Sequence, residues 1–388
     1  MKKNFLSILA VVFVSGSTLV VNSCSKDDDE IATTAVVGIA QDPNNFKGEV
    51  TGGQVVTLDP TKVYVLNGSV RVKDGGKLVI PAGTRIVATA TISSYILVEQ
   101  GGQIYANGTP ASPVSFTSSA ATPGTWGGVI ICGKAPINTG TTSTSEIGTA
   151  IYGGTSATDT SGSLTYVRIE NAGANFSTTV KFNALSLFGV GSGTKVENIA
   201  LVNGAEDGIQ LYGGTVNVSN IVSVANEDDA FVWTDGWAGT ANFLFTQRKT
   251  NGTGNTGIKG MNNASNSAAV PVSSPILKNI TLLGGTTGES NAISLSSGTQ
   301  ANFDNVVISN WAKGFNITGD ATVTYLNGQS KITNVFFDTN VTSKITATST
   351  AGASVTLLSN TYTEKSDATG AGNKTGNPAW AIGWSGLL

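Results

Sequence analysis

The chain has 388 residues, of which 40% are apolar, only 12% are charged and 48 are glycine. This glycine content excludes a mainly helical protein, and the complete absence of histidine excludes Ser-His-Asp triads, Cys-His pairs and histidine-ligated zinc. The formal net charge of −3 makes nucleic acid and anionic membrane surfaces poor partners, so we expect no nucleic-acid partner.

Residues 1–23 have the layout of a secretory signal peptide. Lys2 and Lys3 precede a largely apolar run that ends shortly before Cys24. This layout resembles a bacterial lipoprotein signal, in which the cysteine after the cleavage site is acylated. The resemblance implies that Cys24 is the lipidation site and that outer-membrane lipid, reached through it, is a partner of the mature chain.

An acidic run, 27–30, follows Cys24 almost directly. It resembles the export signal that sends Bacteroidota lipoproteins to the outer face of the outer membrane. We therefore expect residues 24–55 to form the lipidated, acidic tether of a protein that faces the extracellular side.

Short β-rich runs with glycine turns begin near residue 60, and no stretch has sustained helical periodicity. The stretches 69–86 and 96–118 each contain a strand, a glycine turn, a second strand and another turn. We interpret them as stacked coils rather than hairpins. Cys132, in the apolar stretch 127–136, is expected to be a small buried core residue.

A recurring dipeptide gives the repeat length. Asparagine followed by an apolar β-former recurs along the chain at the positions given below, and the first three of these copies are 22 residues apart. This spacing predicts an all-β fold, a single right-handed parallel β-helix of about 22-residue coils over residues 56–388, with asparagine amides stacked at one turn. An antiparallel sandwich would not produce such a register. The dipeptides are Asn198-Ile199, Asn220-Ile221, Asn242-Phe243, Asn279-Ile280, Asn305-Val306 and Asn334-Val335.

Carboxylates cluster on two neighbouring coils. The 22-residue offset places Glu206 under Asp228 and Asp207 under Asp229, with Glu227 beside them. Like charges at this distance raise a pKa, bind a cation or attract basic groups. The same offset stacks Arg248 and Lys249 on Asn226 and Glu227, so that the corner could neutralise itself.

Two functional interpretations of the cluster stay open beside neutralisation. Asp207, Asp228 and Asp229 provide oxygen ligands of the kind that Ca²⁺ prefers, which makes Ca²⁺ the one candidate cofactor. The carboxylates could also form a pair for glycoside hydrolysis, or hold Ca²⁺ for a lyase whose base is Arg248, Lys249 or Lys259.

The arrangement of Asp207 on one coil and Asp228-Asp229 on the next is similar to that of polygalacturonase-type hydrolases, which are right-handed β-helices. Those enzymes also carry a histidine on the following coil, and this chain has none. The resemblance therefore lacks a required catalytic element.

Aromatic residues near the carboxylates suggest a sugar-stacking platform made from Tyr212, Phe231, Trp233, Trp237 and Trp311. Phe231 and Trp233 share one face of a strand, so at least one of them is expected in the core, and Trp237 is the better candidate for exposure. The insertion 249–275 is expected to rise beside the carboxylates, where a lid or binding loop would be placed, and a surface loop without a role is the default interpretation. The predicted ligand-binding residues are Glu206, Asp207, Glu227, Asp228, Asp229, Asp235, Trp237, Arg248 and Lys249.

Several stretches carry a wider likeness: WGGVIICGKAPINTG (126–140), YGGTSATDTSGSLTYVRIENAG (152–173), EDGIQLYGGTVNV, NEDDAFVWTDGW and GNPAWAIGWSGLL. Together they resemble a family of largely uncharacterised Bacteroidota surface-exposed lipoproteins with a right-handed parallel β-helix fold. The resemblance implies fold and location, and it transfers no catalytic residue.

The expected function is that of a cell-surface lipoprotein acting as a rigid binding or structural module for glycans. The alternatives are a polysaccharide lyase or glycoside hydrolase on the β-helix face, and an accessory subunit of an outer-membrane or extracellular assembly. The missing histidine and the incomplete catalytic set favour a protein that is not an enzyme. A polysaccharide or an outer-membrane protein is the expected partner.

Overall fold

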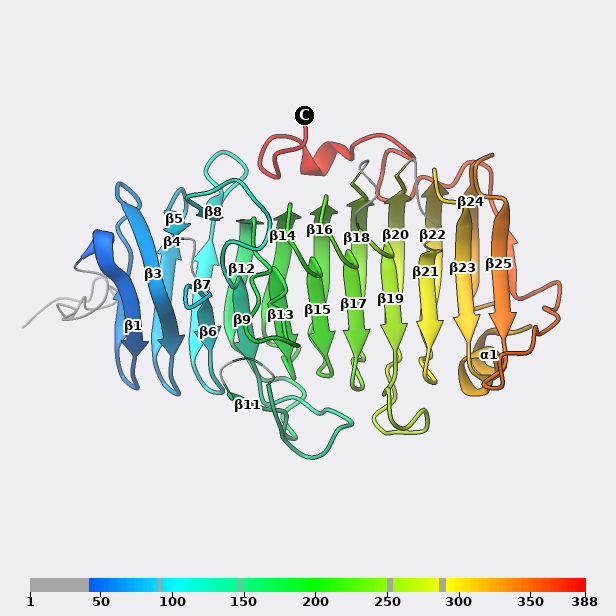
Figure 1. Cartoon of the computed structure of the whole chain (residues 1–388), viewed down its shortest axis with the longest axis horizontal. Helices are drawn as coiled ribbons and strands as arrows, with labels where there is room; N and C mark the ends of the chain where they lie inside the picture. The colour runs from blue at the N-terminus through cyan, green and yellow to red at the C-terminus, as the bar shows by residue number, and fades with distance from the viewer. Residues whose placement is uncertain (1–41, 90–91, 146, 148, 250–253, 286–290) are drawn as a thin grey trace, which may run out of the picture. The chain divides into compact units, whose positions relative to one another are not determined.

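The β-rich runs stack on one another as parallel strands in the computed structural model of the chain (Figure 1). The structure describes residues 42–388 except 90–91, 146, 148, 250–253 and 286–290, and these belong to one compact unit. Among the described residues, 24 strands join a single sheet. The predicted right-handed parallel β-helix is confirmed, and its turn has the hand that parallel crossovers almost always adopt. Cys24 and the expected signal and acidic run lie outside the described residues.

One stack of strands runs the whole length of the helix and faces the viewer in Figure 1. Each strand pairs in parallel with the one before and the one after it in this stack. In order, its strands are β1 (Phe46–Val50), β3 (Val63–Val72), β6 (Ile96–Val98), β9 (Val129–Cys132), β13 (Leu185–Phe188), β15 (Ile209–Tyr212), β17 (Phe231–Thr234), β19 (Ile258–Met261), β21 (Asn291–Ser296), β23 (Lys313–Thr318) and β25 (Ser343–Thr348).

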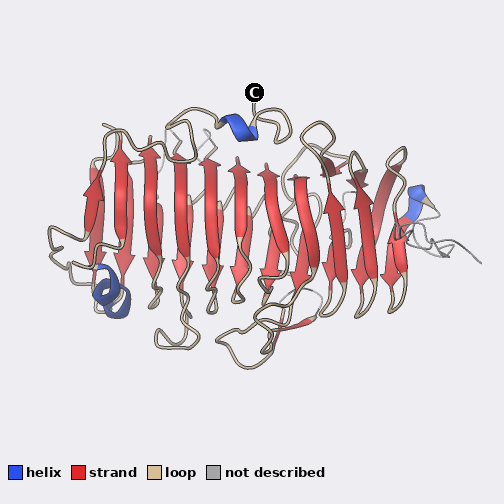
Figure 2. Ribbon diagram, turned by 180° about the vertical axis from the view of Figure 1, so that it is seen from behind, coloured by secondary structure: helices blue, strands red, loops and turns tan. Residues whose placement is uncertain are grey.

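The remaining strands line the other side, which Figure 2 shows from behind. At the N-terminal end they form two short stacks, β2 (Val55–Thr57), β4 (Lys77–Pro81) and β7 (Gln103–Asn107), and β5 (Arg85–Ala88) and β8 (Val114–Ser118). Both stacks continue into the long strand β12 (Gly162–Glu170). It is followed by β14 (Lys195–Val202), β16 (Val218–Val224), β18 (Thr240–Gln247), β20 (Ile276–Leu283), β22 (Asn302–Ser309), β24 (Ile332–Phe337) and β26 (Tyr362–Glu364).

A few elements lie outside the two sides of the helix. The antiparallel pair β10 (Ser143–Thr144) and β11 (Ile151–Tyr152) stands on an insertion, and α1 (Asp320–Leu326) follows β23. Two single 3₁₀ turns are η2 (Pro43–Asn45) and η3 (Ala379–Ala381). No helix of the described residues is long and apolar enough to cross a membrane.

The long strands bend at residues with positive φ, which asparagine tolerates better than other non-glycine residues. Asn279 and Asn305 have φ values of 58° and 56°, and the Asn305 amide donates to Asn279 Oδ1 at 2.7 Å. The predicted asparagine ladder is confirmed here. The predicted stacking of Asn242 on Asn220 is wrong. Asn242 pairs with Ser219, and the bend falls on Phe243, with φ of 59°. Asn242 still accepts from the Asn279 amide at 2.7 Å.

The interior of the helix is filled by columns of inward-facing apolar side chains, which supply most of the stabilisation. Leu211, Trp233 and Gly260 are consecutive members of one column. A Cβ on Gly260 would lie 2.0 Å from Trp233 Cζ2, so glycine is required beside the indole. Glycine at 260 makes room for the indole while the coils keep the spacing of roughly 4.8 Å that backbone hydrogen bonding sets.

Two sequence-based boundaries are wrong. Phe46 pairs with Leu66 in the first coil, so the β-helix begins before residue 56 and includes part of the expected tether 24–55. The expected insertion 249–275 contains β19, which continues the main stack. Its pattern is too short and too rich in glycine to be predicted as a strand.

An insertion, 133–161, covers the outer face of the main stack near its N-terminal end. Ile137, Ile147 and Tyr152 pack on the outward side chains of Ile130 and Phe188. Cys132 is buried in this second core, as predicted, and burial raises the pKa of its thiol to about 12. The outer face of the stack is therefore filled by the chain itself up to the coil of β15.

The C-terminal segment 365–388, which we name the strap, runs back over the outer side of β24, β22, β20, β18 and β16 (Figure 1, red). Ala371, Ala381 and Trp384 pack on Ala200 and its neighbours in the column. The other column members beneath the strap are Val222 and Phe245.

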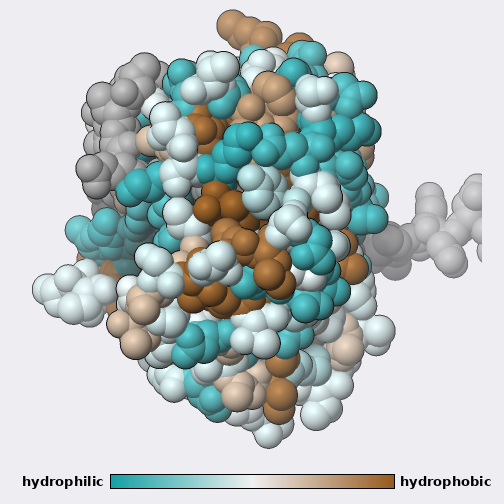
Figure 3. Space-filling view, turned by 90° about the vertical axis from the view of Figure 1, so that its right-hand side faces the viewer, coloured by the Kyte–Doolittle hydropathy of each residue, from teal (hydrophilic) through white to brown (hydrophobic). Residues whose placement is uncertain are grey.

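The last coil ends in strands β25 and β26, and each pairs with only one neighbour among the described strands. Apolar side chains gather on this end of the helix, within a polar rim (Figure 3). Leu358 is 59% exposed there, and Val355, Leu357 and Tyr362 are partly buried.

Candidate functional site

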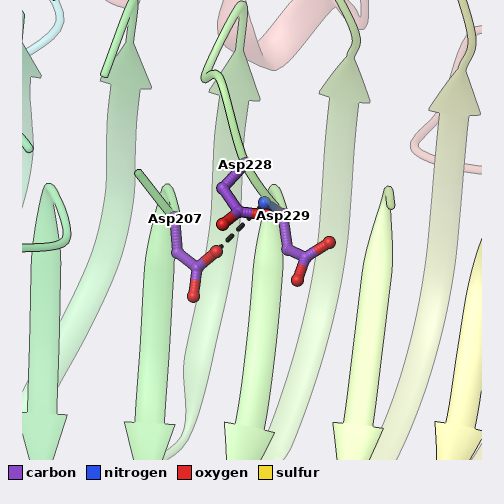
Figure 4. Close-up of side chains that lie close together, drawn as sticks. All are labelled: Asp207, Asp228 and Asp229. Carbon is purple, nitrogen blue, oxygen red and sulfur yellow. Dashed lines mark hydrogen bonds between the residues drawn. The ribbon is translucent and has the colours of Figure 1, made fainter. Parts of the chain in front are cut away.

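Two acidic turns lie on neighbouring coils, immediately before β15 and β17 (Figure 4). Ile209 pairs with Phe231, an offset of 22 residues. The same register places Asp207 beside Asp229 and Glu206 beside Asp228. The predicted two-layer acidic column therefore forms, and we name it the acidic corner: Glu206, Asp207, Glu227, Asp228 and Asp229.

Hydrogen bonds run from coil to coil through the two most buried carboxylates. Asp207 Oδ1 accepts the Asp229 backbone N–H at 3.0 Å (Figure 4). Asp229 Oδ1 in turn accepts the Thr256 backbone N–H at 2.8 Å and the Thr256 hydroxyl. Asp207 and Asp229 are only 8% and 1% exposed, so these bonds replace the water that an exposed carboxylate would have.

Three lysines pair with the acidic corner. Lys181 Nζ lies 2.9 Å from Glu206 Oε2, and Lys249 Nζ lies 2.9 Å from Glu227 Oε1. The third, Lys259 on β19, lies 3.0 Å from Asp229 Oδ2. Asp229 Oδ2 has no well-aligned hydrogen bond among the described residues, so the contact with Lys259 is a charge contact.

The predicted stacking of Arg248 and Lys249 is wrong in register, because Val224 pairs with Gln247 and this coil is one residue longer than 22. Lys249 nevertheless reaches Glu227 through its flexible side chain. Arg248 donates from Nε to the Gly254 carbonyl at 2.8 Å and lies over the Trp311 ring, 5.6 Å from its centroid.

Five carboxyl groups meet three ammonium groups in the acidic corner, so two negative charges remain if all are ionised. Burial, reinforced by the charges of Asp229 and Asp228, holds the pKa of Asp207 well above the ordinary aspartate value. A proton on Asp207 would therefore remove one of these two charges, and a divalent cation would offset both.

The pKa of Glu206 is also raised. Burial is the main cause, and the charge of Asp228 adds to the effect of burial, while the hydrogen bond from Lys181 opposes it. For Lys259, burial lowers the pKa, but the negative charge of Asp229 beside it outweighs burial, and the pKa is raised overall. Lys259 is therefore an ammonium group at neutral pH.

The donor set fits a hard cation. Asp207, Asp228 and Asp229 each offer a carboxylate oxygen, and these atoms lie within 4.8 Å of one another. Oxygen ligands and a surplus of two negative charges suit Ca²⁺. Lys259 competes for the same place, because its ammonium already contacts Asp229.

The expected aromatic platform is wrong. Trp237 is fully buried, and its indole N–H donates to the Val216 carbonyl at 3.0 Å. Its glycine-flanked turn folds inward because the large side chain fills the coil beside Trp233. The other members of the platform are buried as well: Tyr212, Phe231, Trp233 and Trp311.

Asp235 does not belong to the acidic corner. It follows β17, whereas Asp228 and Asp229 precede it, so the strand separates them. The Asp235 carbonyl instead accepts the Asn138 backbone N–H at 2.9 Å, beside the insertion 133–161. Closeness in sequence is a poor guide here, because an extended strand places the residues before it and the residues after it at opposite ends.

Sequence reasoning missed Lys181, Asn255 and Thr256 as members of the site. Asn255 donates to Asp228 Oδ1 at 3.1 Å. These residues lie in loops of unequal length, where no fixed offset applies. Lys259 was considered only as a base, and its place one coil above Asp229 follows from the pairing of Phe231 with Ile258.

These features define a parallel β-helix protein with a charged corner in the turns that precede two central strands of its main stack, β15 and β17. The chain belongs to the family of the pectate-lyase-like β-helix domain, which matches residues 48–385. No curated protein and no solved structure gave a significant match. The family is compatible with a glycan-related module and with a polysaccharide-active enzyme.

Proposed function

We propose that the chain is a glycan-binding β-helix displayed on the bacterial cell surface, and that the acidic corner holds a Ca²⁺ ion through which it binds a polysaccharide. The observation that carries the proposal is the surplus of two negative charges on converging carboxylate oxygens. Because aromatic side chains are buried there, the ligand is held by polar groups and the ion rather than by stacking.

Binding without turnover is supported by the charge of Lys259 and by the contacts of Arg248, two of the residues considered as a lyase base. A lyase base must be unprotonated, and the raised pKa of Lys259 keeps it charged. Arg248 is engaged with Gly254 and Trp311. The chain also has no histidine, which the polygalacturonase-type hydrolases require.

One observation favours an enzyme as the second candidate. Glu206 has a raised pKa beside Asp228, and its side chain is 22% exposed. A carboxyl group with a raised pKa next to a carboxylate is the pairing that glycoside hydrolysis uses. A role as an accessory subunit is supported instead by the apolar end of the last coil (Figure 3).

The test measures retention of the whole chain on immobilised uronate and neutral polysaccharides, with Ca²⁺ and with a chelator, while unsaturated products and reducing ends are followed. We expect retention that needs Ca²⁺, is lost in Asp228→Asn and releases no product. Asp367→Asn, an exposed acid on the strap, is the matched control. Products that disappear in Asp228→Asn would make the corner an active site, and retention unaffected by Ca²⁺ would contradict the ion's role.

Surface display is tested separately. We expect labelled palmitate to be incorporated in cells that make the wild-type chain and not in cells that make Cys24→Ser. We also expect protease added to intact cells to remove the protein. Protein that resists protease in intact cells but not in lysed cells would contradict the proposed outward orientation.

A further inference from the structure

A small cavity of about 10 Å³ borders the acidic corner and shares Asp228 with it. Its walls come from the turn after β16, from the end of β18, from the turn before β19 and from the turn after β22. The volume is about that of a single water-sized sphere. Among the residues that line it are Ser223, Thr246, Asn255, Thr256 and Trp311.

Two polar side chains in the walls have no hydrogen-bond partner within the part of the chain that the structure describes. They are the hydroxyl of Thr246 and the indole N–H of Trp311. Thr246 is 1% exposed and Trp311 is 3% exposed, so bulk solvent does not reach either group. Buried polar groups of this kind are rare in native proteins, and a bound water usually satisfies them.

Three other polar side chains that line the cavity already have hydrogen-bond partners. Ser223 Oγ donates to the Ala230 carbonyl at 2.8 Å, Asn255 donates to Asp228 and the Thr256 hydroxyl donates to Asp229. The unmet hydrogen-bonding capacity therefore belongs to Thr246 and Trp311.

We infer that this cavity binds one water molecule, which accepts a hydrogen bond from the Trp311 indole and shares another with the Thr246 hydroxyl. A metal ion does not fit, because the indole N–H is a donor and has no lone pair for a metal. The carboxylate of Asp228 and the guanidinium of Arg248 both line the cavity and offset each other, so the walls carry no surplus positive charge that would select an anion. A larger ligand has no room.

The water would join parts of the chain that are two coils apart. Thr246 pairs with Leu282, and Leu282 with Ile308, so the turn that carries Trp311 lies beyond an intervening strand. A glycine at 284 permits this approach, because a Cβ there would lie 3.0 Å from Trp311 Cγ. The water thus fixes the indole on which Arg248 rests.

The direct test is a high-resolution crystal structure of the protein. We expect a well-ordered water within hydrogen-bond distance, about 2.7–3.2 Å, of both Thr246 Oγ1 and Trp311 Nε1. In solution, the Trp311 indole proton, assigned by its loss in Trp311→Phe, should show cross-relaxation with a long-lived water. Empty density, or a halide peak there after a bromide soak, would overturn the inference.

Thr246→Val provides the matched variant, since it keeps the shape and removes the hydroxyl. We expect the cross-relaxation of the Trp311 indole to be lost in Thr246→Val and retained in Thr234→Val, a buried threonine whose hydroxyl bonds to Asp235. Both variants keep the core intact, so their folded spectra can be compared. Retention of the water signal in Thr246→Val would also overturn the inference.

Discussion

Individual lysines decide what the acidic corner can bind. Lys181, Lys249 and Lys259 come from loops and a strand that are distant in sequence from one another, and each contacts one carboxylate. Lys259 differs from the other two, because its partner Asp229 is also one of the three converging ligands. Its ammonium and a metal ion therefore compete for the same carboxylate.

Replacing Lys259 by methionine should strengthen Ca²⁺ binding. The variant removes a positive charge 3.0 Å from Asp229 Oδ2 and keeps most of the apolar stem. We expect an affinity about tenfold higher, corresponding to about 1.4 kcal/mol, measured by titration calorimetry. Lys195→Met, which removes an exposed lysine paired with Glu197, is the control. Equal affinities in the wild type and Lys259→Met would show that the ammonium does not compete.

Asp207 should make the protein less stable as pH rises. Its pKa is raised by burial and by the neighbouring carboxylates. Above the ordinary value of about 3.9 the folded state holds a proton that the unfolded state loses, so the free energy of unfolding falls as pH increases through the raised pKa. When a chelator keeps Ca²⁺ away, Asp207→Asn should remove this pH-dependent loss of stability, because the amide does not ionise. Its oxygen still accepts a hydrogen bond from the Asp229 N–H.

Urea unfolding at pH 4 and pH 7 checks this prediction. We expect Asp207→Asn to be more stable than the wild type by about 1 kcal/mol or more at pH 7, with little difference at pH 4. Asp367→Asn, whose side chain is 81% exposed, should show no such gain. A variant that is less stable at pH 7 would mean that the Asp207 carboxylate is stabilising in its ionised form.

At the scale of elements, the long strands share a bend at one position of the coil. Asn198, Asn220 and Asn279 hold positive φ values at equivalent bends, and Phe243 takes the same conformation. The repeat could be recognised in the sequence because the positive φ of each bend favours asparagine, so the same residue type returns at the same place in successive coils. The exception at Phe243 could not be seen in the sequence. Aligning Asn242 with Asn220 by residue type is wrong by one residue, because Asn242 pairs with Ser219.

Asn279 tests how much the bend contributes. Its amide donates to Asn242 and accepts from Asn305, and its φ is 58°. Asn279→Gly loses the amide contacts and keeps access to the conformation, whereas Asn279→Ala loses both. We expect destabilisation of about 1 kcal/mol for glycine, and about 1–2 kcal/mol more for alanine, in urea unfolding. Glycine and alanine variants of equal stability would mean that the conformation costs nothing.

For the described unit as a whole, the strap holds the coils together. A parallel stack consists of contacts between neighbouring coils, and its cohesion is a sum of such terms. The strap adds contacts of another kind, since Thr369 and Gly370 donate to Asn305, Ala371 donates to Thr281 and Trp384 packs against Tyr166. It therefore spans coils that do not touch one another.

Trp384 is the strongest anchor of the strap and should be its most sensitive residue. It is 3% exposed, and its indole N–H donates to the Trp380 carbonyl at 2.7 Å. We expect Trp384→Ala to lower the free energy of unfolding by about 3 kcal/mol or more in urea and to shift the midpoint for all coils together.

Ile382→Ala provides the control for the strap, because Ile382 is 45% exposed and should cost only about 0.5 kcal/mol or less. Similar effects of the two substitutions would contradict an anchoring role for Trp384. A Trp384→Ala transition that affects only part of the circular dichroism signal would mean that the strap does not couple the coils.

The sequence by itself determined the β-helix, the repeat of about 22 residues and the proximity of Asp207 to Asp229. These follow from local periodicity and turn chemistry, which repeat along the chain and need no knowledge of distant contacts. The tertiary structure decided which way each side chain faces and which loops return to the corner. Trp237 points inward because a coil must be filled, and Lys259 meets Asp229 because strand pairing fixes β19 after a loop of irregular length.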